Sequence, residues 1–125
     1  MNITYDQNNI FAKIIKKEIP TKILYEDEFC IAFNDIQPSA PIHILIVPKG
    51  EFISFNDFAL NASPEFISGF FKSVQKIAEQ NNLIENGFRT LFNHGKNASQ
   101  SVFHFHVHLL GGRPLGAIVA GDTNH

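Results

Sequence analysis

The chain has 125 residues, of which 44% are hydrophobic and 13 are phenylalanine, which is enough apolar material for the core of one domain. Its net charge of −2 comes from 10 basic and 12 acidic residues that are scattered along the sequence, so neither nucleic acid nor an anionic membrane surface is an expected partner. The first residues lack the charged and apolar regions of a signal peptide, and no run reaches the ~18 apolar residues of a membrane span. We therefore expect a cytoplasmic protein.

The first predicted element is a short helix in "IFAKIIKKEI" (10–19), where apolar residues pair four positions apart. Asn8 or Asn9 is placed to cap the start of this helix, and Pro20 is placed to end it. Helices this short need tertiary packing, because helix nucleation is costly. We expect its apolar side to pack on the rest of the protein.

Three stretches rich in β-branched and aromatic residues follow, and they predict antiparallel strands at 22–27, 29–35 and 43–48. Cys30 lies in the second stretch, in "EFCIAF", which predicts a buried strand position. It is the only cysteine, so an internal disulfide and a metal site of the CxxC kind are both excluded.

A long helix is predicted from Pro64 to Asn81-Asn82, with Ser63 as its N-cap. The 3.6-residue apolar period that predicts it is carried by Phe66, Ile67, Phe70, Phe71, Val74, Ile77 and Ala78. Two further strands are predicted at 88–93 and 102–110. The expected fold class is α+β, a five-stranded antiparallel sheet with one long and one short helix packed on one side.

Three histidines alternate with apolar residues in the last predicted strand, "VFHFHVHLL". Successive side chains of a strand point to opposite faces, so His104, His106 and His108 share one face. The opposite face, expected to be core, carries Phe103, Phe105, Val107 and Leu109. An ordinary exposed face would mix Thr, Lys, Glu and Ser, so three imidazoles in succession favour a functional site.

A metal site is one interpretation of the histidines. The first and third Cα atoms of an extended strand lie ~13 Å apart, whereas tetrahedral zinc holds its nitrogen ligands at ~2.0–2.1 Å. One strand therefore cannot supply all three ligands, and a site would need two of them plus His43, His94 or a carboxylate. No acidic residue flanks the three histidines in the sequence, so we expect neither a metal nor another cofactor.

Nucleophilic attack on phosphorus explains the pattern better. A neutral imidazole, the main form near pH 7 with a reference pKa of ~6.5, is a nucleophile that needs no separate base. Attack on a phosphate ester, anhydride or amidate gives a phosphohistidine that water can hydrolyse. Neighbouring histidines can hold a proton for the leaving group, and their cationic forms can stabilise charge on the phosphoryl oxygens.

The stretch "HFHVHLL" matches the His-φ-His-φ-His-φ-φ signature of the histidine triad (HIT) superfamily. From about Ile10 to Gly112 the chain resembles the Hint branch of nucleoside phosphoramidases, through "IFAKIIKKEIP", "AFNDIQPSAPIHILIVPK" and "FNHGKNASQSVFHFHVHLLGG". The resemblance implies a single HIT domain over 1–125 with a tail at 113–125. It also implies a purine nucleotide ligand resembling AMP and a homodimer whose sheet continues across the interface.

The resemblance also implies roles for individual side chains. His106 would be the nucleophile that becomes nucleotidylated. The main-chain carbonyl of His104 would accept the Nδ1 proton of His106 and leave Nε2 free to attack. His108 and Ser101 would contact the scissile bond and the leaving group. His43 would be a fourth active-site histidine, although a hydrogen-bonded core histidine is the ordinary explanation for that position.

Further residues are implied for nucleotide binding. Asp35 matches the ribose-binding acid of the family, although taken alone it could simply form an Asx-turn. Asn93 and the backbone around Ser99 to Ser101 would hold the phosphate, and five apolar residues would form the slot for the base. The complete expected set is Asp35, Ile36, Asn93, Ser99, Gln100, Ile10, Phe11, Ile14 and Phe33.

The chain departs from the family pattern in three places. Ala98-Ser99 stands where the phosphate loop usually has small residues, often glycine. The zinc-binding cysteines that some relatives place near the N-terminus are missing from Asn9 to Ala12, so no structural zinc is expected. The tail "RPLGAIVAGDTNH" lacks the aromatic residues of the best-known Hint proteins, which affects the expected leaving group. His94 and His125 are expected to be surface residues.

On this resemblance we expect a purine nucleoside phosphoramidase. It would cleave the P–N bond of adenosine 5′-phosphoramidates, or aminoacyl adenylates, through a covalent nucleotidyl-histidine and without a metal. One alternative is a dinucleoside polyphosphate hydrolase or nucleotidyltransferase of another HIT branch. The other is a nucleotide-binding regulatory protein with little turnover.

Overall fold

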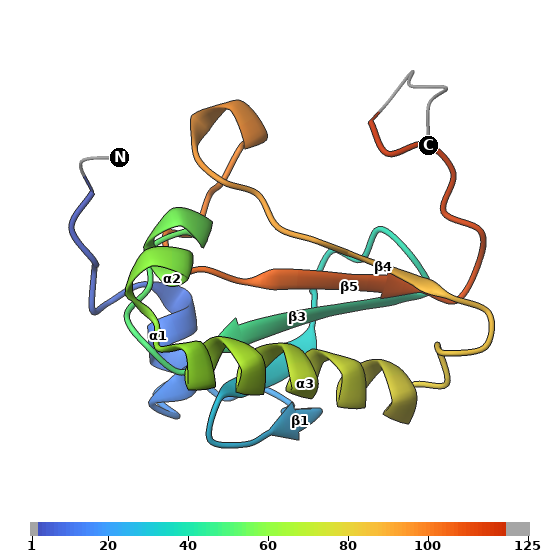
Figure 1. The fold of residues 1–125 in the computed structure, drawn as a ribbon, viewed down its shortest axis with the longest axis horizontal. Helices are drawn as coiled ribbons and strands as arrows, with labels where there is room; N and C mark the ends of the chain where they lie inside the picture. The colour runs from blue at the N-terminus through green and yellow to red at the C-terminus, as the bar shows by residue number, and fades with distance from the viewer. Residues whose placement is uncertain (1–2, 120–125) are drawn as a thin grey trace.

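The computed structural model describes residues 3–119, and its five strands form one antiparallel sheet in the order β1-β2-β3-β5-β4 (Figure 1). The strands are β1 (Tyr25–Glu26), β2 (Cys30–Asn34), β3 (Ile42–Pro48), β4 (Phe88–Leu91) and β5 (Val107–Gly111). The helices are α1 (Ile10–Ile15), α2 (Phe55–Asn61), α3 (Pro64–Gln80) and the short 3₁₀ helix η1 (Lys96–Ala98). The predicted α+β class with a five-stranded antiparallel sheet is confirmed.

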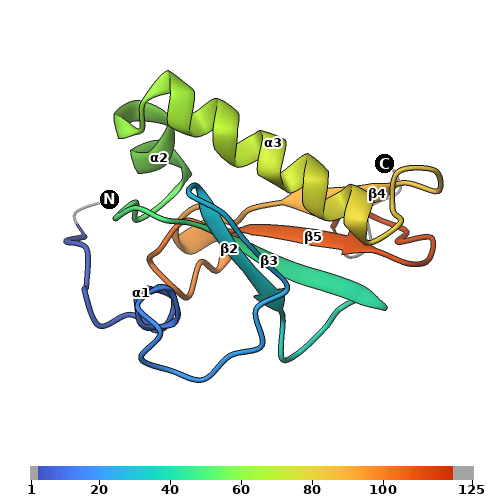
Figure 2. The same cartoon turned by 90° about the horizontal axis from the view of Figure 1, so that it is seen from below.

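Helices cover both faces of this sheet, so the prediction that they pack on one side is wrong. Figure 2 shows α3 on one side of β2 and β3 and α1 on the other. The cause lies in the sequence of β2 and β3, which are apolar at nearly every position, so both faces need cover. The α3 face buries Cys30, Ala32, Ile44 and Ile46. The α1 face buries Ile31, Phe33, Leu45 and Val47.

The long helix α3 has the boundaries that its sequence predicts. The Ser63 side chain accepts the N–H of Phe66, and Pro64 occupies the first turn, where its missing N–H costs nothing. The helix ends at Gln80, and Asn82 then adopts a positive φ of 60°. Its inward residues pack on the sheet, whereas Phe71, which fits the same period, is exposed.

Helix α1 begins where predicted and ends earlier. The Asn9 side chain accepts the N–H of Ala12 at 2.9 Å, so Asn9 is the N-cap. The helix stops at Ile15 because Lys17 turns into the left-handed region with φ 62°. Pro20 therefore does not end it.

The sequence analysis did not predict helix α2. Ser54 caps this helix by accepting the N–H of Asp57, and Phe58 is its only buried residue. A helix of seven residues with one inward side chain has no detectable period. Its position over the sheet nevertheless places Phe58 at the centre of the aromatic core beneath α3.

Strand β5 is shorter than predicted, and it begins only at Val107, after two of the three triad histidines. Its pairing with β3 ends at Ile46–Val107, and the next residues of β3 run toward Pro48, which has no N–H to donate. The N–H of Phe105 is instead donated to the carbonyl of Phe52 at 2.7 Å. Phe105 still enters the core, whereas Phe103, predicted as core, is only half-buried.

Cys30 is fully buried in β2, as its sequence setting predicts. Burial raises the pKa of its thiol to about 12, so the group stays protonated near neutral pH. Within residues 3–119 we find no helix with the length and apolar character that a membrane crossing needs.

Candidate active site

The triad histidines lie on the sheet face that α1 covers. His108 pairs with Leu45 across β3 and β5, and Leu45 belongs to the buried cluster on that face. The alternation of side chains continues before β5 begins, so Phe105 and Val107 enter the opposite core while His104 and His106 turn toward α1. The shared histidine face predicted from the sequence is present although the strand is shorter.

His106 has one ring nitrogen free for chemistry. Its Nδ1 lies 2.7 Å from the main-chain oxygen of His104, and a carbonyl can only accept, so the ring proton is on Nδ1. In the neutral ring this leaves a lone pair on Nε2. Burial is the main cause that lowers the pKa of His106, which keeps the ring neutral near pH 7. The edge-to-face contact with Phe11, with centroids 4.9 Å apart, further restricts the ring.

The His104 side chain is held at both nitrogens and is 1% exposed. Its Nε2 donates to the carbonyl of Pro48 at 2.9 Å, so Nδ1 carries no proton and accepts the hydroxyl of Tyr5 at 2.7 Å. Burial is the main cause that lowers the pKa of His104 to about 4, and the neighbouring His106 acts in the same direction. His104 is therefore a neutral support for the site, with no ring nitrogen available to a substrate.

His43 and His108 form a directed pair. The N–H of Ser39 donates to Nδ1 of His43 at 2.9 Å, so the His43 proton is on Nε2. That Nε2 donates to Nδ1 of His108 at 2.8 Å, which places the His108 proton on its own Nε2. Burial, followed by the neighbouring His106 and His43, lowers the pKa of His108 to about 4. In the free protein His108 is thus a neutral N–H donor beside His106, with ring centroids 5.2 Å apart.

Asp35 closes a turn and also lies beside the histidines of the site. Its Oδ1 accepts the N–H of Gln37 at 2.8 Å, which is the Asx-turn considered from the sequence. Its Oδ2 lies 3.4 Å from Nε2 of His43. The carboxylate raises the pKa of His106 and of His108, and so opposes part of the effect of burial on both rings. Asp35 therefore contributes the negative charge of this site.

Asp35, His43 and His108 also bring possible metal ligands together, with their ligand atoms within 4.8 Å of one another. No acidic residue flanks the triad in the sequence, and the pairing of β2 with β3 brings Asp35 to His43 in the fold. The hydrogen bonds argue against a metal there. The Ser39 N–H occupies Nδ1 of His43, so Nε2 holds the proton and has no lone pair for an ion.

The expected base slot is only partly open. Phe11, Ile14 and Phe33 are buried in the cluster beneath α1 and serve as core. Ile10 and Ile36 are exposed, Ile36 to 95%. Three of the five expected side chains are therefore buried in this structure, and their contact with a base stays a prediction. Two large apolar side chains beside the site remain accessible to a ligand.

Gln100 holds the loop before the triad together. Its Oε1 accepts the N–H of Gly95 at 2.9 Å, and its Nε2 donates to the carbonyls of Ile53 at 2.8 Å and Val102 at 3.2 Å. Both donors of the side-chain amide are therefore used within the protein. The Gln100 side chain therefore shapes the loop, and the predicted contact of the loop backbone with a phosphate stays a prediction.

The two serines of this loop are exposed. Ser99 has φ 58°, in the left-handed region where glycine is the unstrained residue. This backbone conformation fits the expectation that residue 99 aligns with a loop often containing glycine. Ser101 is also exposed, two residues beyond Ser99 and three before His104. Both serines therefore belong to the exposed part of the chain that directly precedes the triad.

A cavity of about 310 Å³ adjoins His43 and His108, and Asn93 also lines it. Its lining also includes two arginines that were not among the predicted site residues. Arg89 donates to the carbonyl of Gly116 at 3.1 Å, and Arg113 donates to the carbonyl of Ser39 at 3.2 Å. These bonds hold the start of the C-terminal tail against the histidines. The only feature of the sequence that points to Arg113 as a site residue is its position directly after the Gly111-Gly112 pair.

A family model, the HIT domain, matches residues 16–115. The chain belongs to the HIT family. The resemblance inferred from the histidine motif is confirmed.

Relatives of this HIT protein match it over nearly its whole length. An uncharacterized HIT-like protein of Rickettsia prowazekii is 43% identical over 115 residues, covering 92% of this chain and 96% of that protein. The purine nucleoside phosphoramidase of Escherichia coli is 45% identical over 115 residues, covering 91% and 95%. A solved HIT family hydrolase from Clostridium thermocellum is 39% identical, with a TM-score of 0.79 and coverage of 91% and 98%.

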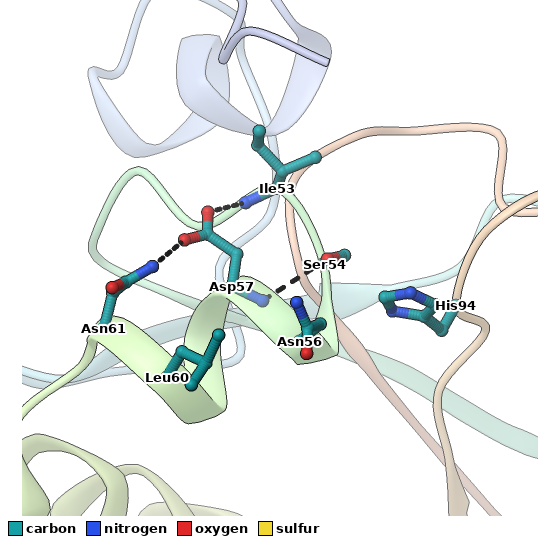
Figure 3. Close-up of a pocket in the computed structure, with 7 residues that line it drawn as sticks. All are labelled: Ile53, Ser54, Asn56, Asp57, Leu60, Asn61 and His94. Atoms are coloured by element: carbon teal, nitrogen blue, oxygen red, sulfur yellow. Dashed lines mark hydrogen bonds between the residues drawn. The ribbon is translucent and has the colours of Figure 1, made fainter. Parts of the chain in front are cut away.

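A second cavity of the HIT protein, about 230 Å³, lies between α2 and His94 (Figure 3), and no triad histidine lines it. The Ser54 hydroxyl and the Asp57 carboxylate that line it are hydrogen-bonded in α2 and its N-cap. The Asp57 carboxylate accepts the N–H of Ile53 at 2.8 Å and the side-chain amide of Asn61 at 2.7 Å. This cavity is therefore explained by the capping of α2. His94 is exposed, as predicted, and His125 lies outside the described residues.

Proposed function

We propose that this HIT protein is a purine nucleoside phosphoramidase, which releases AMP by hydrolysing the P–N bond of adenosine 5′-phosphoramidates or the P–O bond between phosphate and the acyl group of aminoacyl adenylates. The hydrogen bond from Nδ1 of His106 to the His104 carbonyl carries the proposal, because it leaves Nε2 as a nucleophile in a neutral ring. The Escherichia coli relative named purine nucleoside phosphoramidase supports this branch of the family.

In the proposed mechanism Nε2 of His106 attacks phosphorus and forms a covalent nucleotidyl-histidine. The P–N bond of the substrate breaks in the same step, and the amine leaves. His108 supplies the proton for the amine. Burial keeps His108 neutral in the free protein. The cationic form of His108 that the mechanism needs is therefore expected only when the substrate phosphate adds negative charge beside the ring. Water then attacks the phosphorus of the intermediate, gives its proton back to His108 and releases AMP.

The nucleotide is proposed to lie across the loop and the open part of the apolar surface. Asp35 would accept hydrogen bonds from the ribose hydroxyls, since its carboxylate is partly exposed beside His43. Ile10 and Ile36 would contact the base with their exposed side chains. Asn93 and the backbone around Ser99 to Ser101 would hold the phosphate, with Ser101 beside the leaving group.

The homodimer remains part of the proposal. Strand β4 is at one edge of the sheet, so its outer backbone groups can pair with a second copy. Phe88 and Phe92 are exposed beside this edge and would be covered by such a contact. Pairing of two β4 strands would continue the sheet across the interface.

The first test is hydrolysis of adenosine 5′-phosphoramidate with and without EDTA. We expect AMP release at the same rate in both, because the His43 proton stands where a metal would bind. Loss of activity with EDTA would contradict the metal-free mechanism. Faster cleavage of diadenosine polyphosphate would favour another HIT branch, and AMP binding without turnover of either compound would favour a regulatory role.

The pH dependence of the reaction follows from the lowered pKa of His106. A lowered pKa means that the neutral nucleophile persists below the reference value of ~6.5. We expect the acid limb of kcat/KM for adenosine 5′-phosphoramidate, where His106 becomes protonated, to have its midpoint below pH 6.5. The measurement is kcat/KM across pH 4.5 to 8.5, and a midpoint of the acid limb above 6.5 would contradict the expectation.

A further inference from the structure

Tyr5 contacts the triad at His104. Its hydroxyl lies 2.7 Å from Nδ1 of His104, and the two rings meet edge to face with centroids 5.6 Å apart. Since the His104 proton is on Nε2, facing the Pro48 carbonyl, the hydroxyl of Tyr5 is the donor. The His104 ring is thus fixed at both ends, by Pro48 and by Tyr5.

The segment that carries Tyr5 is tied to the domain. A turn at Asp6 is closed by its Oδ1, which accepts the N–H of Asn8 at 2.8 Å, and by its carbonyl, which accepts the side-chain amide of Asn9. Lys16 donates to the carbonyl of Gln7 at 3.0 Å, and the Gln7 side chain is hydrogen-bonded to Glu51. Tyr5 is therefore presented to His104 by a folded turn that leads into α1.

A cavity of about 210 Å³ lies behind His104 and is lined by Tyr5, Lys16 and Glu51 among others. Lys16 and Glu51 make this cavity polar enough for water to bind close to the His104 ring. A water molecule at Nδ1 would donate from a mobile position, whereas the Tyr5 hydroxyl donates from a fixed one. Burial raises the pKa of Tyr5, so its hydroxyl keeps the proton that it donates.

We propose that Tyr5 is a positioning residue for the attack by His106. It immobilises the His104 ring, and the main chain of the same residue presents the carbonyl that holds the Nδ1 proton of His106. The inference rests on the proposed function for its effect on rate. Tyr5 precedes the HIT domain match at 16–115, so this contact is supplied by a segment in front of the matched domain.

The test compares Tyr5→Phe with Tyr25→Phe, which removes the hydroxyl of the only other tyrosine. Tyr25 donates to Asp27 at 2.7 Å, away from the histidines. We expect Tyr5→Phe to lower kcat about tenfold, the usual scale for one lost buried hydrogen bond, with KM within about twofold of wild type. Tyr25→Phe should leave both constants within about twofold.

Ring ¹⁵N spectra separate a positioning role from general stability. In the wild type we expect the proton of His104 on Nε2 and that of His106 on Nδ1. In Tyr5→Phe the His106 signals should shift toward a mixture of tautomers while the melting temperature stays close to that of Tyr25→Phe.

Three results would overturn the inference. These are kcat unchanged in Tyr5→Phe, a slower reaction with unchanged His106 signals, and a wild-type His104 with its proton on Nδ1. If the wild type hydrolyses no phosphoramidate, the proposed function fails, and the ring spectra still decide the role of Tyr5.

Discussion

Replacing His106 with alanine is expected to lower kcat for adenosine 5′-phosphoramidate by about 10⁴-fold or more, the scale seen when a catalytic nucleophile is removed. The lone pair on Nε2 of His106 is the only one that the triad offers to a substrate. The ring of His104 is bonded at both nitrogens, and Nδ1 of His108 accepts the His43 proton. No other triad ring can take over the attack without breaking these bonds.

The matched control for this variant is His94→Ala, since His94 is exposed and lies by the cavity under α2. It should keep wild-type activity. Binding of AMP, measured by calorimetry, should survive in His106→Ala within about tenfold, because the alanine removes the nucleophile and leaves Asp35 and the loop unchanged. Turnover by His106→Ala at more than a hundredth of the wild-type rate would show that another group attacks phosphorus.

Replacing Phe58 with alanine is expected to lower the free energy of unfolding by about 3–5 kcal/mol, the usual cost of a large cavity in a core. Phe58 is 1% exposed and stacks on Phe105 with centroids 4.7 Å apart. It also meets Phe52 and Phe70 edge to face, at 5.2 and 5.4 Å. Phe105 stands between His104 and His106 in the chain, so this packing also supports the site.

Leu60→Ala is the control in the same helix, because Leu60 is 73% exposed and loses almost no buried area. Its effect on the free energy of unfolding should stay within about 0.5 kcal/mol. Urea denaturation of both variants at neutral pH gives the two values. Equal losses from Phe58→Ala and Leu60→Ala would contradict the assignment of Phe58 to the core.

The sequence predicts those elements that have their own local signals. Helix α3 has a cap at Ser63, a proline in its first turn and a complete apolar period, and its boundaries follow. Helix α2 has one buried residue and no period, so only its packing against the aromatic core defines it. Helix α1 covers the second face of the sheet because β2 and β3 are apolar at nearly every position. That requirement becomes visible only when the two strands are considered together.

The candidate site also combines residues that the sequence predicts with groups that only the fold brings together. The triad histidines were found because their side-chain type and spacing point to chemistry, whereas Asp35 and His43 were implied by the resemblance to the HIT family. The backbone partners that set the ring protons, the Pro48 carbonyl and the Ser39 N–H, were not found, because any residue has these groups and only the fold selects them. The base slot stays a prediction, because a pattern of apolar residues does not distinguish Phe33 in a core from the same side chain in an open pocket.

The most direct test of the account is the mass of the intact protein, quenched during turnover of adenosine 5′-phosphoramidate. We predict a species heavier by one adenylyl group, with the added mass on the peptide that contains His106 and missing from His106→Ala. Turnover with no such species, or with the added group on another residue, would contradict the assignment of His106 as the nucleophile.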